Sequence, residues 1–421
     1  MGNGSPSPLA SSFVLRCISH SCEFSSDAQV LVCENCGGPL EAIYDYEKLR
    51  SSHSGLPADG AHTGVWRYAP LLPINPKTKM ISLGEGGTPL VHADRLTQDL
   101  GMRRLLVKDE SRNPTLSFKD RKSAVAVSKA AEFGAKGVAN MTAGNAGSSV
   151  AAYAARAGIP AYIFTIDGIS ESKLAKLVSY GAHVFKTKAP TKELMTFVAA
   201  VSKRYGMTNM TAASRYNPYV KEGSKTCVFE LYEQFGGDLP GWIMVPIGGG
   251  GNIAGLFKGL RELKLLGLIE KYPRLVGVQG EGCAPVVEAF EKGLPPDQVP
   301  TVQNPHTIAH SILDSWAPDG DQALLAIRET GGLAVGVSDD ELLESMKAMS
   351  GREGLFVEPA AASPLAALKR LLSEGKVGAD ESVVLLATGF GSNQPEAAIR
   401  AWGSPPTIEL DLDAFEARIA G

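Results

Sequence analysis

Lys119 stands between a short apolar run and a helical pattern, a position from which its amine could do covalent chemistry. Residues 105–107 are apolar and typical of a strand, and small apolar residues recur at helical spacing over 124–131. Desolvation beside the ring of Phe118 and the positive end of a helix both oppose a charged ammonium. Because attack on a carbonyl carbon requires a neutral amine, the pattern indicates a Schiff-base lysine. The plainer alternative is a solvated lysine at a helix start.

A glycine-rich loop offers a second kind of chemistry, the binding of phosphate. Residues 248–251 are all glycine; they follow the apolar run 243–247 and precede Asn252. Backbone amides in such a loop can approach a phosphate closely, and a following helix adds positive potential. The loop also fits the dinucleotide fingerprint, with Glu281 available for a ribose, so an oxidoreductase that uses a nicotinamide cofactor is a rival interpretation. That interpretation leaves Lys119 unexplained, and a bland glycine turn is a third option.

Two further turns place polar groups directly after apolar runs. The turn 142–147 follows the run 138–141 and has the form of an anion cradle, although a simple turn in which Asn145 caps a helix is the alternative. Thr388 follows the run 383–386. Its hydroxyl either faces a ligand or satisfies its own backbone.

Strand-like and helix-like segments alternate over most of the chain. The strand-like runs are 105–107, 138–141, 161–164, 183–185, 243–247, 275–278 and 383–386, and the helical patterns include 148–156, 171–180 and 191–205. Such βα units predict an α/β fold with mainly parallel sheets clad by helices. We expect two open α/β domains around a central cofactor cleft at the carboxyl ends of the strands. The expected division is a small domain at 111–214 and a large cofactor-binding domain formed by 80–110 and 215–403.

The composition limits the class of protein. The chain has 421 residues, 44% of them hydrophobic, and a formal net charge of −4. That length suits a large core in about two domains. No basic block points to nucleic acid, and no apolar run approaches the roughly 18 residues that span a membrane. We expect a cytoplasmic protein in which residues 1–8 are a disordered lead-in.

Cysteines cluster near the N-terminus, at Cys17, Cys22, Cys33 and Cys36. Cys33 and Cys36, followed by two glycines, have the spacing of half a zinc ribbon. The other half is irregular, since four residues separate Cys17 from Cys22 and His20 stands at the two-residue spacing. We expect a ribbon-like module at 13–45 with structural zinc on the four cysteines, or with His20 in place of Cys22. A ribbon that folds without metal is the alternative, and a cytoplasmic location disfavours disulfides.

Four motifs occur in order along the chain: Leu-Gly-Glu-Gly-Gly-Thr-Pro-Leu at 83–90, Ser-Phe-Lys-Asp-Arg at 117–121, Gly-Asn at 144–145 and Glu-Pro-Ala at 358–360. Together they resemble the threonine synthase family, pyridoxal-phosphate enzymes of fold type II, the tryptophan-synthase-β-like fold. The resemblance extends from about Cys17 to Trp402. It implies a carbon–oxygen lyase of amino-acid biosynthesis that converts O-phosphohomoserine and water to threonine and phosphate. We also expect a homodimer.

The resemblance assigns roles to the matching positions. Lys119 would hold pyridoxal phosphate and, once released, remove the α-proton of the substrate. Asn145 would donate to the phenolic oxygen of the cofactor, and Thr388 would face its pyridine nitrogen. The expected cofactor contacts are Lys119, Phe118, Asn145, Gly248, Gly249, Gly250, Gly251, Asn252 and Thr388. The expected contacts of the amino-acid substrate, O-phosphorylated in this family, are Thr142, Ala143, Gly144, Ala146 and Lys221.

Three positions depart from the family pattern. Ala146 stands where a threonine is usual, Val220 where an arginine would clamp the substrate phosphate, and Phe390 where a histidine is expected. Lys221 could replace the arginine only if it points inward, and then as a point charge. We expect all three positions in loops around one pocket. The alternatives are therefore β-elimination or β/γ-replacement on another amino acid, or a non-enzymatic homologue that uses its ribbon to dock a partner.

Overall fold

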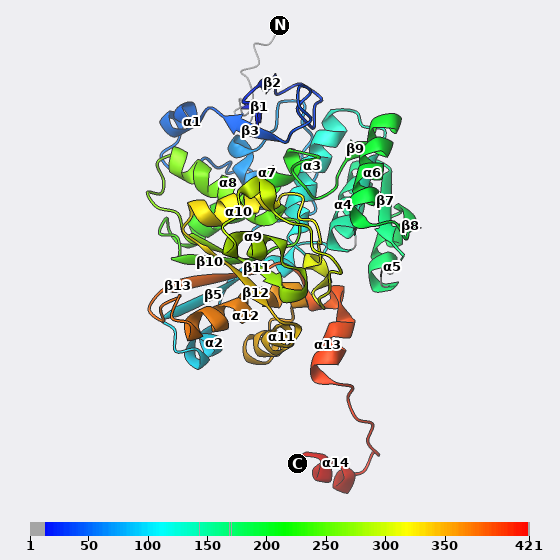
Figure 1. Ribbon diagram of the computed structural model, residues 1–421, viewed down its shortest axis with the longest axis vertical. Helices are drawn as coiled ribbons and strands as arrows, with labels where there is room; N and C mark the ends of the chain where they lie inside the picture. Colours follow the sequence, from blue (N-terminus) through cyan, green and yellow to red (C-terminus); the bar gives the residue numbers. More distant parts are fainter. Residues whose placement is uncertain (1–12, 143, 168, 170, 420–421) are drawn as a thin grey trace.

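The computed structural model describes residues 13–142, 144–167, 169 and 171–419. Residues 1–8, the expected disordered lead-in, and Ala143, an expected substrate contact, lie outside the described residues. The described chain contains a six-stranded, a four-stranded and a three-stranded sheet (Figure 1). All strand pairs of the four-stranded sheet and all but one of the six-stranded sheet are parallel. The predicted α/β fold with mainly parallel sheets is therefore confirmed.

The six-stranded sheet is the centre of the larger part of the molecule. Its order is β12 (Leu333–Val337), β11 (Arg274–Gly280), β10 (Trp242–Pro246), β13 (Ser382–Ala387), β5 (Arg104–Asp109) and β4 (Leu90–His92). The edge strand β4 is antiparallel to β5. In the central register, Met244 lies opposite Val276 on one side and Leu385 on the other. Strands that are buried on both faces read as continuous apolar runs, which is why the sequence marks them clearly.

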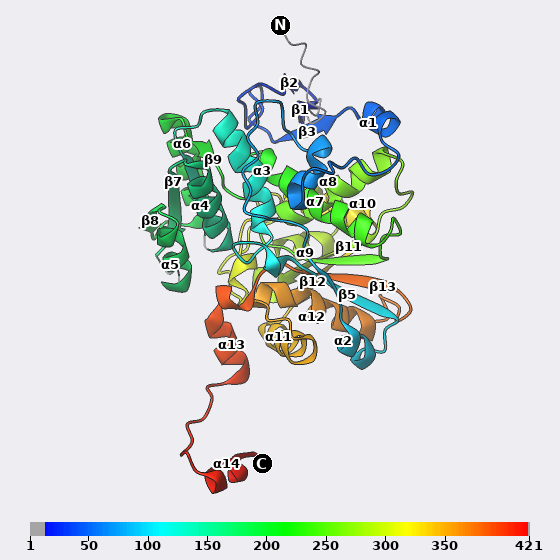
Figure 2. The same cartoon turned by 180° about the vertical axis from the view of Figure 1, so that it is seen from behind.

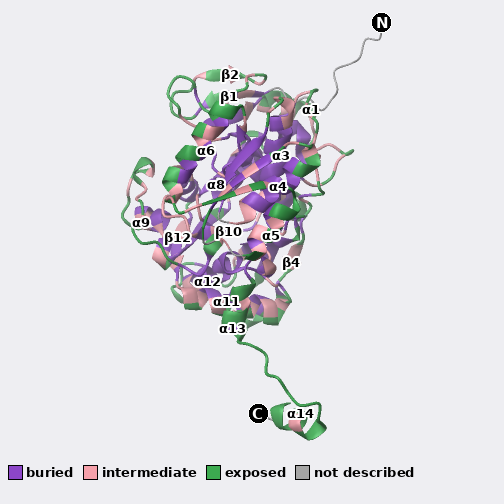
Figure 3. Ribbon diagram, turned by 90° about the vertical axis from the view of Figure 1, so that its right-hand side faces the viewer, coloured by how far each residue is buried: buried purple, intermediate pink, exposed green. Residues whose placement is uncertain are grey.

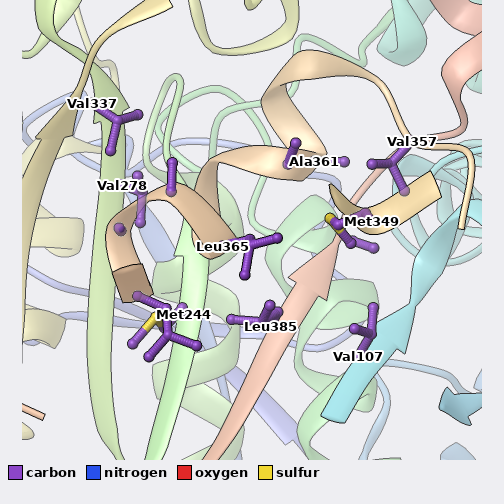
Figure 4. Packing of buried hydrophobic residues seen from close by; sticks show 14 of the residues in the cluster. Val107, Met244, Val278, Val337, Met349, Val357, Ala361, Leu365 and Leu385 are labelled. Carbon is purple, nitrogen blue, oxygen red and sulfur yellow. The ribbon is translucent and has the colours of Figure 1, made fainter. Parts of the chain in front are cut away.

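Helices cover both faces of this sheet. They are α7 (Tyr219–Gln234), α8 (Gly251–Leu265), α10 (Gly320–Glu329), α11 (Asp339–Glu353) and α12 (Pro359–Ser373). Met244 and Leu385 pack with Leu365 of α12 in one core cluster (Figure 4). Ile243 and Val384, the preceding residues of the same strands, pack with α7, α8 and α10 in another cluster. Successive residues thus serve opposite faces, as the two-residue period of a strand requires, and β10 is buried along its whole length (Figure 3).

The four-stranded sheet lies beside the larger one in Figures 1 and 2. Its order is β8 (His183–Thr187), β7 (Ala161–Ile166), β6 (Val138–Met141) and β9 (Thr208–Asn209), and the helices near it are α3 (Lys119–Glu132), α4 (Asn145–Ala157), α5 (Glu171–Ser179) and α6 (Thr191–Tyr205). The predicted strand at 138–141 and helix at 191–205 occur with the expected bounds. Because α3 packs against both α4 and α7, it links the two parts of the fold.

The three-stranded sheet near the N-terminus is antiparallel. Its order is β2 (Glu23–Ser25), β1 (Phe13–Cys17) and β3 (Leu40–Tyr44). A carboxylate of β3 docks it on α7 and α8, because Glu41 lies 3.1 Å from Lys221 Nζ and 2.7 Å from Arg261 Nη2. Nearby, the Tyr44 hydroxyl donates to Glu222 at 2.7 Å. We call the three-stranded sheet β2-β1-β3 the ribbon sheet. The charges beneath it are tolerated because each has a partner of opposite charge or a hydrogen bond.

Smaller elements complete the described chain. The remaining helices are α1 (Tyr46–Ser52), α2 (Asp94–Asp99), α9 (Pro285–Glu291), α13 (Pro395–Trp402) and α14 (Leu412–Ile419), and the 3-10 turns are Gly64–Leu71, Glu110–Arg112, Glu281–Cys283, Pro296–Gln298, His310–Ile312 and Gly391–Asn393. In Figure 1, α14 projects from the body of the molecule on an extended segment. Within the described ranges, no helix has both the length and the apolar character needed to cross a membrane.

Candidate active site

A cavity of about 390 Å³ opens beside the carboxyl ends of β6, β10 and β13. It brings together most of the residues predicted from the sequence: Phe118, Lys119, Thr142, Gly144, Asn145, Ala146, Gly248, Gly249, Gly250, Gly251, Asn252 and Thr388. Open α/β sheets bind their ligands at this end of the strands, and the volume is that of a small-molecule pocket. The cavity is therefore the candidate active site.

Lys119 is the first residue of α3 and lines the cavity. Its Nζ lies 3.8 Å from the centroid of the Phe118 ring. Burial lowers the pKa of the Lys119 amine to about 8, although Glu358 and Asp314 act in the opposite direction. The physical cause is the removal of the ammonium from water. Near pH 8 a large share of this amine is therefore neutral, the form that attacks a carbonyl carbon.

Hydrogen bonds from the backbone and from side chains hold the start of α3 against the end of β13 and against α4. The Phe118 amide donates to the Thr388 carbonyl oxygen at 3.1 Å. The carboxylate of Asp120 accepts from the amide and the hydroxyl of Thr115, both at 2.6 Å, which closes the turn before the helix. A hydroxyl from α4, that of Ser149, donates to the same carboxylate at 2.6 Å. These bonds fix the direction in which Lys119 leaves the helix.

Arg121 anchors the other side of the same helical turn. Its guanidinium lies 2.7 Å from Glu110, which follows β5, and 2.7 Å from Glu230 of α7. Lys108 of β5 also lies 2.7 Å from Glu230. Burial alone would raise the pKa of Glu230, but Arg121 and then Lys108 outweigh it and lower this pKa to about 2. The network therefore joins β5, α3 and α7 through paired, buried charges.

The loop of four glycines wraps closely against the segment 314–320. A Cβ atom on Gly248 would lie 2.9 Å from the Asp314 carboxylate, and one on Gly250 would lie 2.5 Å from the Asp319 carbonyl oxygen. Gly250 also has a φ of +92°, a conformation that favours glycine. The four glycines line the cavity without side chains, and the loop leads into α8 (Gly251–Leu265), whose first amides have no acceptor within the helix. This is a suitable cradle for a phosphate.

Hydrogen bonds to the side chain of Thr142 fix the shape of the turn 142–147. Thr142 Oγ1 accepts from the amides of Gly144 at 2.9 Å and of Gly147 at 3.1 Å. The next residue, Asn145, donates from Nδ2 to the two carboxylate oxygens of Glu358 at 3.0 and 3.1 Å. Glu358 immediately precedes α12 and lines the cavity beside Lys119. Thr142 therefore fixes the shape of the turn, and the turn holds Asn145 at the cavity wall.

The structure places several predicted residues away from the cavity. Lys221 is buried beneath the ribbon sheet, where it contacts Glu41 and donates to Gln322 at 2.9 Å. Val220 packs in the apolar cluster that joins the ribbon sheet to α3, and the ring of Phe390 packs against Phe356. Of the three departures from the family pattern, only Ala146 lines the cavity. The expectation that all three surround one pocket is therefore wrong. Val220 on α7 and Phe390 after β13 turn toward apolar neighbours that bury them, and not toward the cavity.

The rival interpretation of the glycine loop also fails on geometry. Glu281, the residue that could hold a ribose, contacts Arg370 at 3.0 Å and does not line the cavity.

Some cavity residues were missed from the sequence. Asp314 lines the cavity, and burial raises its pKa to about 6. Lys122 and Lys173 also line it. Glu358 belongs to the Glu-Pro-Ala motif at 358–360, yet nothing in the sequence indicates its contact with Asn145. Lys122 was detectable, because residues three apart on a helix share a face and it follows Lys119 at that spacing.

The N-terminal cysteines meet in the ribbon sheet. The Sγ atoms of Cys17, Cys33 and Cys36 all lie within 4.8 Å of one another. Cys22 Sγ lies 3.3 Å from Cys33 Sγ, and Cys17 Sγ lies 3.6 Å from Cys36 Sγ. Gly38 leaves room for them, since a Cβ there would lie 3.1 Å from Cys36 Sγ. Three of the four sulfurs thus lie close enough together to share one metal ion, whereas Cys22 Sγ does not belong to this group.

An amine kept partly neutral by burial can form a covalent bond with a carbonyl carbon, and the glycine loop can bind a phosphate. Pyridoxal phosphate carries both groups, and the cavity holds both binding elements, so its residues fit this cofactor. The chain belongs to the pyridoxal-phosphate-dependent enzymes: the family described as "Pyridoxal-phosphate dependent enzyme" matches residues 81–389.

Relatives of known function narrow the family. The threonine synthase of Methanocaldococcus jannaschii is 39% identical over 402 residues, which cover 95% of this chain and 98% of that protein. The threonine synthase of Methanosarcina acetivorans is 36% identical over 408 residues, 97% of this chain and 98% of that protein. The chain is thus a member of the threonine synthase family.

Solved structures agree with the fold. A serine racemase from maize is 21% identical with a TM-score of 0.62, and the match covers 79% of this chain and 92% of the racemase chain. A diaminopropionate ammonia lyase from Escherichia coli is 16% identical with a TM-score of 0.66, and the match covers 93% of this chain and 97% of the lyase chain. At these identities, both likenesses support the fold alone.

Proposed function

We propose that this protein is a threonine synthase, which converts O-phosphohomoserine and water to threonine and phosphate. The observation that carries the proposal is the match to threonine synthases over nearly the full length of both chains. The cavity adds a chemical reason, because a buried amine and a phosphate cradle suit the pyridoxal phosphate that this reaction uses. The substrate of the proposed reaction is a small, O-phosphorylated amino acid.

Residues of this chain would hold pyridoxal phosphate in the cavity. Lys119 would bind its aldehyde carbon, the glycine loop 248–251 and Asn252 its phosphate, and Thr388 would face its pyridine nitrogen. Phe118, beside Lys119, would limit where the ring can lie. When bound, the pyridine ring acts as an electron sink that acidifies the carbons next to the substrate amine.

Proton transfer falls to Lys119. When it is not bound to the cofactor, the Lys119 amine would accept the proton from the α-carbon of the substrate, because its pKa of about 8 suits a base near neutral pH. The carboxylates of Glu358 and Asp314 lie close enough to favour the resulting ammonium. The amides of the turn 142–147 would bind the substrate carboxylate and present the α-carbon to this base.

One cavity residue favours a second candidate function. Ala146 lacks the hydroxyl that is usual at this position of the family, and it lines the cavity. A site that guides water or the γ-carbon less well would suit an elimination or replacement at the β-carbon of another amino acid. Such a reaction uses the same Lys119 base.

A product assay separates these functions. The holoenzyme is incubated with O-phosphohomoserine, O-phosphoserine, serine and threonine, while phosphate, 2-oxo acid and amino-acid products are followed. We expect equimolar phosphate and threonine from O-phosphohomoserine, and no product when Lys119→Ala replaces the wild type. Inertness toward O-phosphohomoserine with turnover of a β-substituted amino acid would reject the threonine synthase proposal.

We also propose that Cys17, Cys22, Cys33 and Cys36 bind one structural zinc ion. The short sulfur–sulfur distances support it, and none of these cysteines forms a disulfide in the described structure. The ribbon sheet is small, so a metal would contribute much of its stability. We expect about one zinc per chain by elemental analysis, and loss of that zinc in Cys33→Ser. Metal-free wild-type protein that takes up no added zinc and melts unchanged with a chelator would refute this.

We further propose that the protein is a cytoplasmic homodimer. In this dimer a second copy would cover the C-terminal tail, which we define as residues 395–419, from α13 to α14. All six cysteines are free, which suits a reducing compartment. The tail exposes Ile399, Trp402, Ile408, Leu410, Leu412, Phe415 and Ile419. Apolar side chains on a projecting segment suit a protein partner. Sedimentation should show a dimer that chain truncation after Gly403 weakens; a monomeric wild type, or a truncated chain that dimerises equally well, would contradict this.

A further inference from the structure

The backbone of Leu116, three residues before Lys119, is strained. Its φ is +68°, in the left-handed region that a large side chain rarely adopts. The described residues that line the cavity do not include Leu116, so its conformation is not explained by a contact with a ligand. Such a conformation persists only where the surrounding structure holds it, and it is common beside functional groups. The contacts that hold Leu116 therefore bear on the position of Lys119.

The segment that follows β13 holds the carbonyl oxygen of Leu116. This oxygen accepts from the amide of Phe390 and from Nδ2 of Asn393, both at 3.0 Å. The next residue, Ser117, pairs with Gly389 in an antiparallel bridge. Asn393 is only 2% exposed, so water cannot readily replace its hydrogen bond, and losing that bond would leave a poorly hydrated carbonyl. The side chain of Asn393 thus helps to fix the turn that leads into α3.

The same side chain also contacts α5, a helix beside the four-stranded sheet. The Nζ atom of Lys176, a half-buried residue of α5, donates to Asn393 Oδ1. Lys173, one helical turn earlier, lines the cavity, whereas Lys176 and Asn393 are not among the described residues that do so. Asn393 therefore uses its acceptor toward α5 and its donor toward the strained Leu116.

We propose that Asn393 is a positioning residue for Lys119, and that Lys176 couples this positioning to α5. Asn393 holds the turn in the strained conformation from which Lys119 enters the cavity, without touching the reacting groups. Burial lowers the pKa of the Lys119 amine to about 8, so a turn that relaxes toward solvent should raise this pKa toward its ordinary value. This role of Asn393 rests on the proposed function, because Lys119 must bind pyridoxal phosphate, but it does not depend on which amino acid is converted.

The first measurement is the rate at which apo protein takes up pyridoxal phosphate, followed by stopped-flow absorbance from about pH 6 to about 10. In Asn393→Ala we expect the midpoint of the rise in rate to move upward by about 0.5 pH unit or more, because the amine becomes better solvated. Glu358 and Asp314, whose charges also act on Lys119, are unchanged in this variant. For the substrate found in the product assay, kcat should fall about tenfold or more while KM changes less than about threefold.

Variants of Lys176 test the coupling to α5. Lys176→Met removes the contact with Asn393 but leaves the bond to Leu116, so it should shift the midpoint and kcat in the same direction by less. Lys176→Arg, which keeps a donor, should restore most of both values. The matched control is Lys292→Met, which breaks an exposed pair with Glu288 and should behave as the wild type.

A glycine tests the strain itself. Leu116→Gly keeps the left-handed turn at no steric cost, because glycine adopts a positive φ readily. In the double variant Leu116→Gly with Asn393→Ala, we expect the midpoint and kcat to return about halfway or more toward the wild type. A double variant no better than Asn393→Ala alone would show that Asn393 does not act through the strained turn, and would overturn the proposal.

Urea denaturation separates positioning from stability. If Asn393→Ala unfolds more easily but keeps the wild-type midpoint and kcat when folded, Asn393 is only structural and the proposal is overturned. If Asn393→Ala does not fold, Lys176→Met replaces it, and unchanged values in that variant overturn the proposal. A wild type that forms no chromophore with pyridoxal phosphate would instead reject the proposed function, whereas variants that match a chromophore-forming wild type would reject the positioning role alone.

Discussion

Four consecutive charged residues at the start of α3 divide between two regions of opposite character. Arg121 enters a network in which Glu110 and Glu230 meet its guanidinium at 2.7 Å, and Asp120 accepts three hydrogen bonds at 2.6 Å. Lys119 and Lys122 face the cavity and, within the described chain, form no ion pair. Removing one partner of a buried charge pair is strongly destabilising, whereas a buried charge that has no partner is already unfavourable until a ligand compensates it. The contrast separates residues that keep the helix in place from residues that do the chemistry.

The largest effect should follow from removing the amine that the cavity is built around. Lys119→Ala should lower turnover by a factor of about 1,000 or more, since it removes both the covalent attachment and the base. Its free energy of unfolding should stay equal or rise, because an unpaired buried amine is replaced by a methyl group. Steady-state assays, absorbance spectra and urea denaturation check the two parts. A Lys119→Ala variant that loses stability as well as activity would show that Lys119 also stabilises the fold, contrary to the distinction drawn here.

For Arg121, on the other side of the same helical turn, we expect a substitution to reduce the stability of the fold. Arg121→Met should lower the free energy of unfolding by about 3–5 kcal/mol, because it leaves two buried carboxylates to share Lys108. The matched control is Lys292→Met, which breaks an exposed pair with Glu288 and should cost less than about 1 kcal/mol. Urea denaturation of both variants provides the measurement. Equal costs for the two variants would show that the Arg121 network contributes little.

A titration can test whether Lys119 is as poorly solvated as the cavity suggests. Only the neutral amine attacks an aldehyde, so the rate at which apo protein takes up pyridoxal phosphate should rise with pH. The rise should have its midpoint near the pKa of about 8, well below the value of a solvated lysine. Stopped-flow absorbance over pH 6 to about 10 gives the profile. A midpoint near the ordinary lysine value of about 10.4 would place the amine in water.

The residues that sequence alone could identify are those fixed by local structure. Lys119 and the loop 248–251 each sit where a strand gives way to a helix, and in such a unit the position along the chain nearly determines the position in space. The apolar strand runs are equally local, which is why the order of βα units was predicted correctly. These features owe little to contacts between distant parts of the chain.

The residues that sequence could not place depend on which way a side chain turns. Val220 and Lys221 lie in the first turn of α7, yet one packs in an apolar cluster and the other pairs with Glu41 of the ribbon sheet. Only the docking of β3 on α7 decides this, and β3 is far away in the sequence. Asp314 reaches the cavity from a segment without helix or strand, so no periodicity could mark it.

The smallest expected effect concerns the one departure from the family pattern that does reach the cavity. Ala146 lies beside Asn145 at the start of α4, so Ala146→Thr would add a hydroxyl to the substrate side without touching the paired network. If the protein is a threonine synthase, kcat/KM for O-phosphohomoserine should rise severalfold, by about 1 kcal/mol or less of added hydrogen bonding, while pyridoxal phosphate affinity stays the same. Steady-state kinetics and a cofactor titration measure the two quantities. If the variant instead lost activity toward O-phosphohomoserine and the wild type preferred a β-substituted amino acid, the alanine would mark a site adapted to that substrate.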